Sequence, residues 1–460
     1  MTAPDYKKPL QDMPVAWKVE EPFRVGTPND GTPNDGAPKG PWWQRFGDTR
    51  LDELAAKAIT GSPTLAVAGA RLAQLEAAGA ATYPQVGIAA RDVRSRISAN
   101  RPLTNNIAPN FSTTQTDMAF ALSASYEPDL FGRVDSVIAG ARATAEQSMA
   151  DFENIRLVLT ADLATAYFNL RAVDVELDVL ARAINLQRRS LALATTRCEL
   201  GVASGLDVAQ PQALIDSTLT QVDVLRRQRA QFEHAIATLT GTPAPLFSLA
   251  RDSRVVQPPV VPIGLPSDLL ERRPDVAAAE RAMAAANAQI GVANAAFYPS
   301  ISLGALIGTQ SRLERLLFNA GSGIWSLGLT LAQPLIDGGR IRANADFAQA
   351  GYDATVANYR RVVLGAMQEA EDGIIGSAAL ERAHKQAQVA VASATRVLDI
   401  ATARYEGGVA SILDLITAEQ SLLASERLAA QLAGQRLLIS VFLIRALGGD
   451  REGPRKIASE

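Results

Sequence analysis

One segment of eleven residues occurs twice in this chain, and this repeat constrains the fold more than any other feature. Residues 197–207 read Arg-Cys-Glu-Leu-Gly-Val-Ala-Ser-Gly-Leu-Asp, and residues 404–414 read Arg-Tyr-Glu-Gly-Gly-Val-Ala-Ser-Ile-Leu-Asp. Eight of the eleven positions are identical, and the two copies lie 207 residues apart. Each copy interrupts a helical pattern, so the repeat predicts a turn between helices that occurs once in each of two similar halves.

A long segment without proline precedes each copy of the turn. These segments cover residues 133–199 and 340–405, and apolar residues recur in them at helical spacing. At about 1.5 Å per residue, each predicts a helix of roughly 100 Å, which is too long for an ordinary globular domain. A shorter helix is expected after each turn, at residues 206–240 and 411–447.

The period of the apolar residues changes to two in the segments of about residues 85–127 and 300–333. Phe120 and Leu122, for example, alternate with smaller residues, and Trp325, Leu327 and Leu329 alternate with Ser326, Gly328 and Thr330. This pattern predicts two pairs of strands, each strand long enough to cross a bilayer when tilted. Four strands do not close a barrel, so we expect other copies of the chain to complete it. A small soluble sheet packed on helices is the alternative.

These segments predict four parts of the chain. Residues 1–60 form an N-terminal arm, rich in proline, and an equatorial segment, which Trp42, Trp43 and Phe46 anchor to the body. Residues 61–265 and 266–447 are two structural repeats, each with a helix, two strands, a long helix, a turn and a shorter helix. Residues 448–460 form a C-terminal tail.

The composition excludes several classes of protein. With 47% hydrophobic and 20% charged residues the chain is expected to fold, and a net charge of −3 argues against nucleic-acid binding. Cys198 is the only cysteine, and His234 and His384 are the only histidines. We therefore expect no internal disulfide, no zinc site, no other cofactor and no enzyme activity. The sequence contains no run of about 18 apolar residues that would predict a membrane-spanning helix.

A set of short motifs extends over nearly the whole chain. They are Pro-Asp-Tyr-Lys-Lys-Pro at 4–9, Trp-Trp at 42–43 with Phe-Gly-Asp at 46–48, Tyr-Glu-Pro-Asp-Leu-Phe-Gly-Arg at 126–133, Leu-Glu-Arg-Arg-Pro-Asp at 270–275, Phe-Tyr-Pro at 297–299, Gln-Pro-Leu-Ile-Asp-Gly-Gly-Arg at 333–340 and both copies of the turn. Together they resemble the TolC/OprM-type outer-membrane efflux proteins, in the lipoprotein branch of the outer-membrane factors.

This resemblance implies a fold class, a location and partners. The fold is a mixed α and β membrane protein, a homotrimer whose twelve-stranded transmembrane β-barrel, with four strands from each chain, continues into a long periplasmic α-helical barrel. It would lie in the outer membrane of a Gram-negative bacterium, in contact with outer-membrane lipid, and conduct drugs or other small compounds passively. The implied partners are a periplasmic adaptor (membrane fusion protein) and an inner-membrane transporter, commonly of the resistance-nodulation-division type.

The N-terminus departs from the lipoprotein branch. Relatives there carry a lipidated cysteine just before the Pro-Asp-Tyr motif, where this chain has Met1, Thr2 and Ala3. We therefore expect no acylation site in this chain, and a mature form from which the leader has been removed. Cys198 lies at a predicted helix end, where an inert thiol is expected.

The resemblance also places the periplasmic entrance at the two repeated turns. Leu413 and Asp414 are the best candidates for a gate, because three copies would form an apolar plug and an acidic ring. Helix N-capping by Asp207 and Asp414 is the alternative. Relatives place an acidic ring slightly farther along this helix, where Thr417 stands here.

Two further roles are expected at the turns. Arg404 and Tyr405 would latch the tip to neighbouring helices, or Arg404 would only interact with the dipole of its own helix. The expected adaptor-docking residues are Gly201, Val202, Ala203 and Ser204 in the first turn and Gly408, Val409, Ala410 and Ser411 in the second. A soluble coiled-coil scaffold or adaptor is the alternative function, and it predicts a protein that stays in solution without detergent.

Overall fold

The computed structural model describes residues 6, 41–78, 85–99, 113–261 and 272–449, which divide into two compact units. Unit 1 holds residue 6 and the described residues of 74–146 and 281–357, and unit 2 holds the described residues of 41–73, 147–280 and 358–449. Most of the predicted N-terminal arm, the motif at 4–9 apart from Tyr6, the start of the motif at 270–275 and the tail beyond residue 449 lie outside the described residues.

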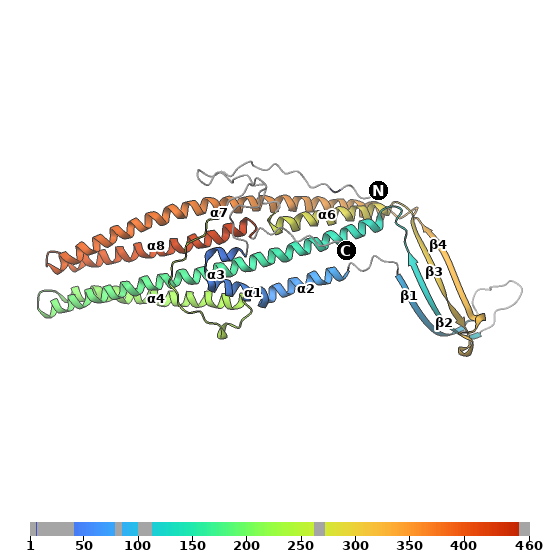
Figure 1. Ribbon diagram of the computed structural model, residues 1–460, viewed down its shortest axis with the longest axis horizontal. Helices are drawn as coiled ribbons and strands as arrows, with labels where there is room; N and C mark the ends of the chain where they lie inside the picture. Colours follow the sequence, from blue (N-terminus) through green and yellow to red (C-terminus); the bar gives the residue numbers. More distant parts are fainter. Residues whose placement is uncertain (1–5, 7–40, 79–84, 100–112, 262–271, 450–460) are drawn as a thin grey trace. The chain divides into compact units, whose positions relative to one another are not determined.

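Unit 1 contains one antiparallel sheet of four strands in sequence order (Figure 1). The strands are β1 (Gln85–Ile97), β2 (Thr113–Tyr126), β3 (Ser300–Ser311) and β4 (Gly323–Ala332). The short 3-10 helices Glu314–Leu316 and Ala320–Ser322 lie between β3 and β4. Because β2 pairs with β3, the two predicted pairs of strands join into one sheet.

The two faces of this sheet differ in polarity as the alternating pattern predicted. The register places Ile88, Leu122, Ile307 and Trp325 side by side across the four strands, and all four side chains are exposed in the single chain. On the other face Asp117 of β2 pairs with Arg91 of β1 and accepts a hydrogen bond from the side-chain amide of Gln310 of β3, 2.6 Å away. One face is therefore an apolar surface, and the other carries a polar tie across three strands.

The two longest helices follow the two proline-free segments, and shorter helices precede and follow them. In chain order they are α1 (Thr49–Gly61), α2 (Pro63–Ala78), α3 (Arg133–Glu199), α4 (Gly205–Leu239), α6 (Pro274–Ala295), α7 (Arg340–Glu406) and α8 (Ile412–Ala446), with short 3-10 helices at Trp42–Phe46 and Ala244–Leu246. Helices α3 and α7 each have 67 residues, and α4 and α8 each have 35. The two long helices are confirmed, and the order helix, two strands, long helix, shorter helix recurs.

The aromatic residues at the start of the described chain pack into the core of unit 2. Trp42, Trp43 and Phe46 are buried, and the ring centres of Phe46 and Phe168 lie 4.8 Å apart. The indole N–H of Trp42 donates to the hydroxyl of Thr160 at 3.2 Å. The predicted anchoring of this segment to the helical body is therefore confirmed.

A buried group of charges fixes the segment after α4 to the body of unit 2. Asp174 of α3 accepts from the guanidinium of Arg229 of α4 at 2.7 Å and from Arg171 at 3.1 Å. Arg229 also donates to the carbonyl of Leu249, and Asp174 accepts from the backbone N–H of Asp252. The extended segment is thus held by ion pairs and backbone hydrogen bonds that little water reaches.

By length and composition, one helix among the described residues, α8, could cross a membrane. Part of its apolar surface, however, packs within unit 2. Leu415 and Ile416 join one buried cluster, and Leu437, Val441 and Ile444 join another. We therefore assign α8 to the packed helices of unit 2, because length and apolar composition alone do not distinguish a membrane-spanning helix from a helix that packs inside a protein.

Candidate functional site

The repeated segments form two helical hairpin tips with the same backbone. The first tip, residues 200–204, joins α3 to α4, and the second tip, residues 407–411, joins α7 to α8. Gly201 has φ 74° and Gly408 has φ 75°, in the left-handed region that glycine adopts without strain. The next N–H groups, of Val202 and Val409, each donate at 3.0 Å to the carbonyl five residues earlier. Each long helix therefore ends in a Schellman motif.

The shorter helices begin with identical capping boxes, which corrects the proposed capping role of the aspartates. Ser204 and Ser411 are the N-cap residues, and Asp207 and Asp414 are the third residues of their helices. Each serine hydroxyl accepts from the backbone N–H of the aspartate, whose carboxylate accepts in return from the serine backbone N–H. The Ser-x-x-Asp spacing explains this arrangement, because a helix starts at the serine and not at the acid.

The carboxyl group of Asp414 is held in its charged form. The backbone N–H of Ser411, followed by the Ser411 hydroxyl and the charge of Arg404, lowers the pKa of Asp414 below its ordinary value of 3.8. Asp414 lies on the surface of the single chain. It therefore presents a permanent negative charge at neutral pH.

The candidate gate residues share the exposed side of α8. Leu413 is 57% exposed, and Asp414 and Thr417 are also exposed. The hydroxyl of Thr417 donates to the carbonyl of Leu413 at 2.7 Å, so these two residues lie one turn apart. The opposite side of α8, with Leu415 and Ile416, is buried.

Arg404 and Tyr405 have different surroundings, although the sequence grouped them as one latch. Arg404 is exposed, whereas Tyr405 is buried in the tip core, a cluster formed by Ala194, Leu398, Tyr405, Ile412, Leu415, Ile416 and Ala418. The guanidinium that lies over the Tyr405 ring, 4.3 Å from its centre, belongs to Arg197 of α3. Arg197 also donates to the carbonyl of Glu406 at 3.1 Å. Arg197 is not among the residues expected from the sequence to latch the tip, although the repeat aligns it with Arg404.

Apolar side chains are exposed at both tips. Val202 is 74% exposed and Val409 is 70% exposed. Of the other expected docking residues, Gly201, Ser204, Gly408 and Ser411 are exposed, and Ala203 and Ala410 are half-buried. The tips therefore offer small and apolar surfaces to a partner, and no charged side chain is among these eight residues.

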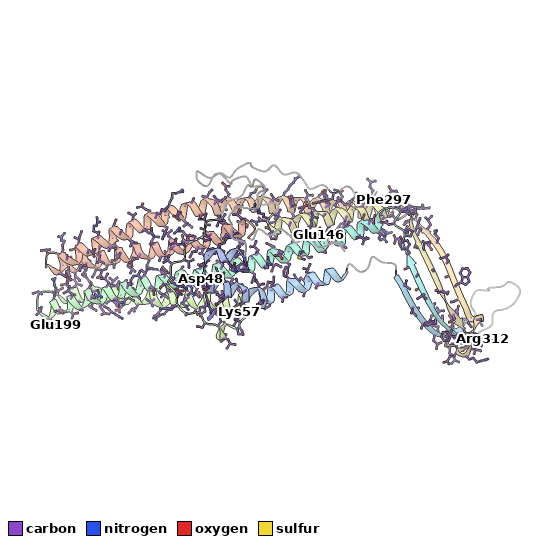
Figure 2. All side chains as sticks on the ribbon, viewed as in Figure 1. Asp48, Lys57, Glu146, Glu199, Phe297 and Arg312 are labelled. Carbon is purple, nitrogen blue, oxygen red and sulfur yellow. The ribbon has the colours of Figure 1, made fainter. Side chains whose placement is uncertain are left out.

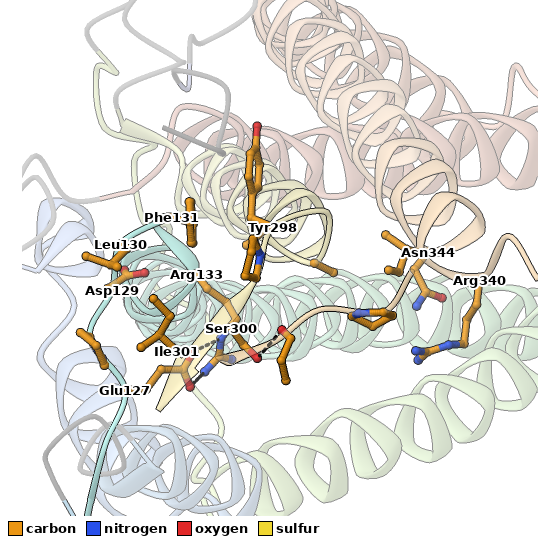
Figure 3. Close-up of a pocket in the computed structure, with 17 residues that line it drawn as sticks. Glu127, Asp129, Leu130, Phe131, Arg133, Tyr298, Ser300, Ile301, Arg340 and Asn344 are labelled. Carbon is orange, nitrogen blue, oxygen red and sulfur yellow. Dashed lines mark hydrogen bonds and ion pairs between the residues drawn. The ribbon is translucent and has the colours of Figure 1, made fainter. Parts of the chain in front are cut away.

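A cavity of about 270 Å³ lies in unit 1, where strands meet helices (Figure 3). The rings of Phe131 and Tyr298 stack with centres 5.1 Å apart. The guanidinium of Arg133 pairs with Glu127, and the carboxylate of Asp129 accepts from the backbone N–H of Asp135 at the start of α3. Glu127 and Arg133 thus neutralise each other, and Asp129 caps the start of α3. We assign these residues a structural role at the connection between strands and helices.

The cysteine, the two histidines and the acidic residues of the described chain lie apart from one another where a metal site would need them together. Figure 2 shows all the placed side chains, and among them no group of three or more His, Cys, Asp or Glu residues could hold a metal ion. Cys198 lies at the end of α3, His234 in α4 and His384 in α7. The groups that carry charge or shape at the tips can restrict a passage or bind a partner, and neither role requires bond chemistry.

Comparisons with known proteins agree on one family. The family model described as outer membrane efflux protein matches residues 54–242 and 265–449. The chain is 30% identical over 421 residues to the pyoverdine export outer membrane protein OpmQ of Pseudomonas aeruginosa, covering 90% of this chain and 88% of OpmQ. It is 31% identical over 460 residues to the probable efflux pump outer membrane protein SepC of Pseudomonas putida, covering 97% and 93%. The open-state crystal structure of the Neisseria gonorrhoeae MtrE outer membrane channel superposes with a TM-score of 0.82 at 26% identity, covering 97% of this chain and 98% of MtrE.

Proposed function

Because this chain belongs to the outer membrane efflux protein family, it is an outer-membrane component of an efflux pump, and we propose that three copies form one gated exit duct. The duct conducts drugs or other small compounds from the periplasm to the outside without bond chemistry. The single observation that carries the proposal is the sheet of four strands, which has one apolar and one polar face and two free edges.

The free edges support the trimer. Among the described strands, β1 and β4 are the outer ones, and each pairs with a described neighbour on one side. Unpaired strand edges are not stable in lipid, so a sheet with a lipid-facing side must close. Joining β4 of each copy to β1 of the next in a ring of three gives a barrel of twelve strands. The exposed row that ends in Trp325 then faces outer-membrane lipid, and Asp117 faces the lumen.

The equal helices support a second barrel in the periplasm. α3 and α7 have the same length, and so do α4 and α8, so the two halves of the chain can take equivalent places around one axis. Three chains then supply six helical hairpins. In the proposed ring each chain thus contributes two copies of one structural unit.

The gate is placed at the second tip. Leu413, Asp414 and Thr417 lie on the exposed side of α8, where the copies of a ring can bring them together. Three Leu413 side chains narrow the passage, and three Asp414 carboxylates repel anions and attract cations. Arg197 and Tyr405 hold the ends of α3 and α7 together and thereby stabilise the closed arrangement.

The tips also bind the periplasmic adaptor. Val202 and Val409 are exposed beside glycine, alanine and serine, a surface that allows helices of a partner to approach closely. The adaptor connects the duct to an inner-membrane transporter of the resistance-nodulation-division type, which selects the compounds.

Single-channel conductance of the detergent-purified protein in a planar bilayer tests this function. The wild type should give small, brief currents, and the double variant Leu413→Ala/Asp414→Ala should give larger and longer ones. The matched control is Leu206→Ala/Asp207→Ala, which removes the equivalent capping carboxylate from the first tip. If both double variants show the same increase in current over the wild type, loss of the capping box explains the effect and the gate is not at the second tip.

The scaffold alternative makes the opposite prediction for the same sample. A soluble coiled-coil protein would remain monodisperse without detergent and would give no current. The exposed apolar face of the sheet favours the membrane protein, because a soluble sheet would bury that face.

A further inference from the structure

A buried polar layer crosses the packed helices about two turns beyond the second tip. Glu419 of α8 is 2% exposed, and one of its carboxylate oxygens accepts a hydrogen bond from the hydroxyl of Ser190 of α3. The other oxygen is buried without a hydrogen-bond partner among the described residues. One turn before Ser190 on α3, Gln187 is 1% exposed, and neither polar atom of its side-chain amide has a partner there.

Such unsatisfied groups are costly, and an interior that only needed packing would not contain them. Glu419 lies on the same side of its helix as Ile412, Leu415 and Ile416, which belong to the tip core. The exposed gate candidates Leu413 and Thr417 lie on the other side. A movement of the buried side of α8 therefore moves the candidate gate as well, because both belong to one rigid helix.

We propose that Glu419 is a proton-binding site that holds the second tip closed while the carboxyl group is protonated. This inference rests on the gate proposed above. A neutral carboxyl group remains in the apolar tip core, bonded to Ser190. An ionised one requires water or new donors, and it obtains them when α8 loosens from α3.

The surroundings of Glu419 leave the proton as the controlling ligand. α3 contributes Ser190 and the uncharged Gln187. In the neighbouring tip core, α7 contributes the apolar Leu398, and Leu214 of α4 packs against that cluster. Tyr405 is the titratable group within the tip core, and it carries the Arg197 guanidinium over its ring. The causes that act on the pKa of Glu419 are burial, which raises it, and the Ser190 hydroxyl, which lowers it; no charged side chain of a packed helix is among them.

The direction of the pH effect follows from this shift. A carboxyl group whose pKa is raised in the closed state binds its proton more tightly there than in the open state. Its support for the closed state is complete below the ordinary pKa and is lost as pH rises through the raised pKa. For each pKa unit by which Glu419 differs between the closed and open states, the ratio of the closed to the open population changes by up to about tenfold.

Hydrogen exchange in the backbone of residues 412–425 tests the site directly. Detergent-purified trimer of the wild type and of Glu419→Gln is compared at about pH 5 and about pH 8, with both proteins always at the same pH, so that the intrinsic pH dependence of exchange cancels. We expect protection in the wild type to fall relative to the variant as pH rises. Ser190→Ala should move this change to higher pH, because it removes the hydrogen bond that lowers the pKa.

The matched control is Glu426→Gln, which changes another glutamate of α8 that lies 3.9 Å from Arg182. It should keep the wild-type profile. The inference is overturned if Glu419→Gln also keeps that profile, or if wild-type protection is the same at both pH values after correction for intrinsic exchange. Conductance of the same variants judges the gate separately: a pH effect on exchange without one on current leaves the proton site standing and removes the gate from the second tip.

Discussion

The guanidinium of Arg197 lies 4.3 Å from the centre of the Tyr405 ring, although the two residues are far apart in the sequence. The contact joins the end of α3 to the end of α7, and the bond from Arg197 to the Glu406 carbonyl strengthens it. The two hairpins are therefore tied to each other beside the candidate gate.

Replacing Tyr405 by leucine should loosen this tie. Leucine keeps the apolar volume in the tip core but offers no π face, and a cation–π contact at a partly exposed site contributes about 0.5–1 kcal/mol. We expect a higher open fraction in single-channel recordings. Tyr405→Phe is the control, since it keeps the ring and should conduct like the wild type. Equal currents from the leucine and phenylalanine variants would show that the stacking does not stabilise closure.

Asp414 should make the closed duct select cations over a wide range of pH. Because its pKa is lowered from 3.8, its capping contribution and its charge are complete above that ordinary value and are lost as pH falls through the lowered one. In the Glu419→Gln background, where the proposed proton site does not titrate, the reversal potential in a salt gradient should therefore stay constant from about pH 5 to 8 and decrease only in stronger acid. Asp414→Asn should reduce the cation preference at neutral pH. A reversal potential that does not change in this variant would place the acidic ring elsewhere.

The buried charges at Asp174 should contribute strongly to the stability of unit 2. Asp174→Asn takes the common carboxylate away from the buried Arg171 and from Arg229, which keeps its pair with Glu233. Breaking a buried pair in this way costs about 3–5 kcal/mol. Chemical unfolding followed by circular dichroism measures the change. Asp223→Asn in α4 is the matched control, because its pair with Arg226 is exposed and contributes about 0–1 kcal/mol. Similar losses for both variants would mean that the buried ion pairs add little stability.

The two faces of the sheet should respond differently to charge. Leu327→Arg places a cation on the apolar face, where arginine costs about 2–4 kcal/mol near the middle of the bilayer. Ser326→Arg places the same charge one residue away on the opposite face and should be tolerated. The two variants are compared by their insertion into lipid vesicles, measured as the fraction of the protein that floats with the lipid. Normal insertion of the Leu327 variant would contradict a lipid-facing role for this face.

Much of the fold could be predicted because local patterns control it. The absence of proline predicted α3 and α7, and the change of period to two predicted the strands that pair through Ile307 and Trp325. The repeated segment placed both tips. These features depend on neighbouring residues of the same element, so a sequence displays them directly.

The side-chain environment of the candidate site could not be predicted in the same way. N-capping is the alternative to a gate role that the sequence leaves open for Asp414, whereas the Ser411 side chain three residues earlier takes the N-cap position. The contact of Arg197 with Tyr405 and that of Glu419 with Ser190 have no local signal in the sequence, because the two residues of each pair come from different helices. Only the packing of α3 against α7 and α8 decides which polar side chains become buried.

The duplicated turn has a consequence for symmetry. Gly201 and Gly408 give both tips the same backbone conformation. The side chains at equivalent positions of the repeat differ, however, with Cys198 equivalent to Tyr405 and Gln212 equivalent to Glu419. In the proposed ring, the periplasmic end is sixfold in its backbone but threefold in its side chains. A partner that contacts only the backbone of the turns has six equivalent binding sites. A proton that binds Glu419, or an ion that passes Asp414, has three. The two halves of the chain can thus diverge in chemistry while the rim that they build keeps a single geometry.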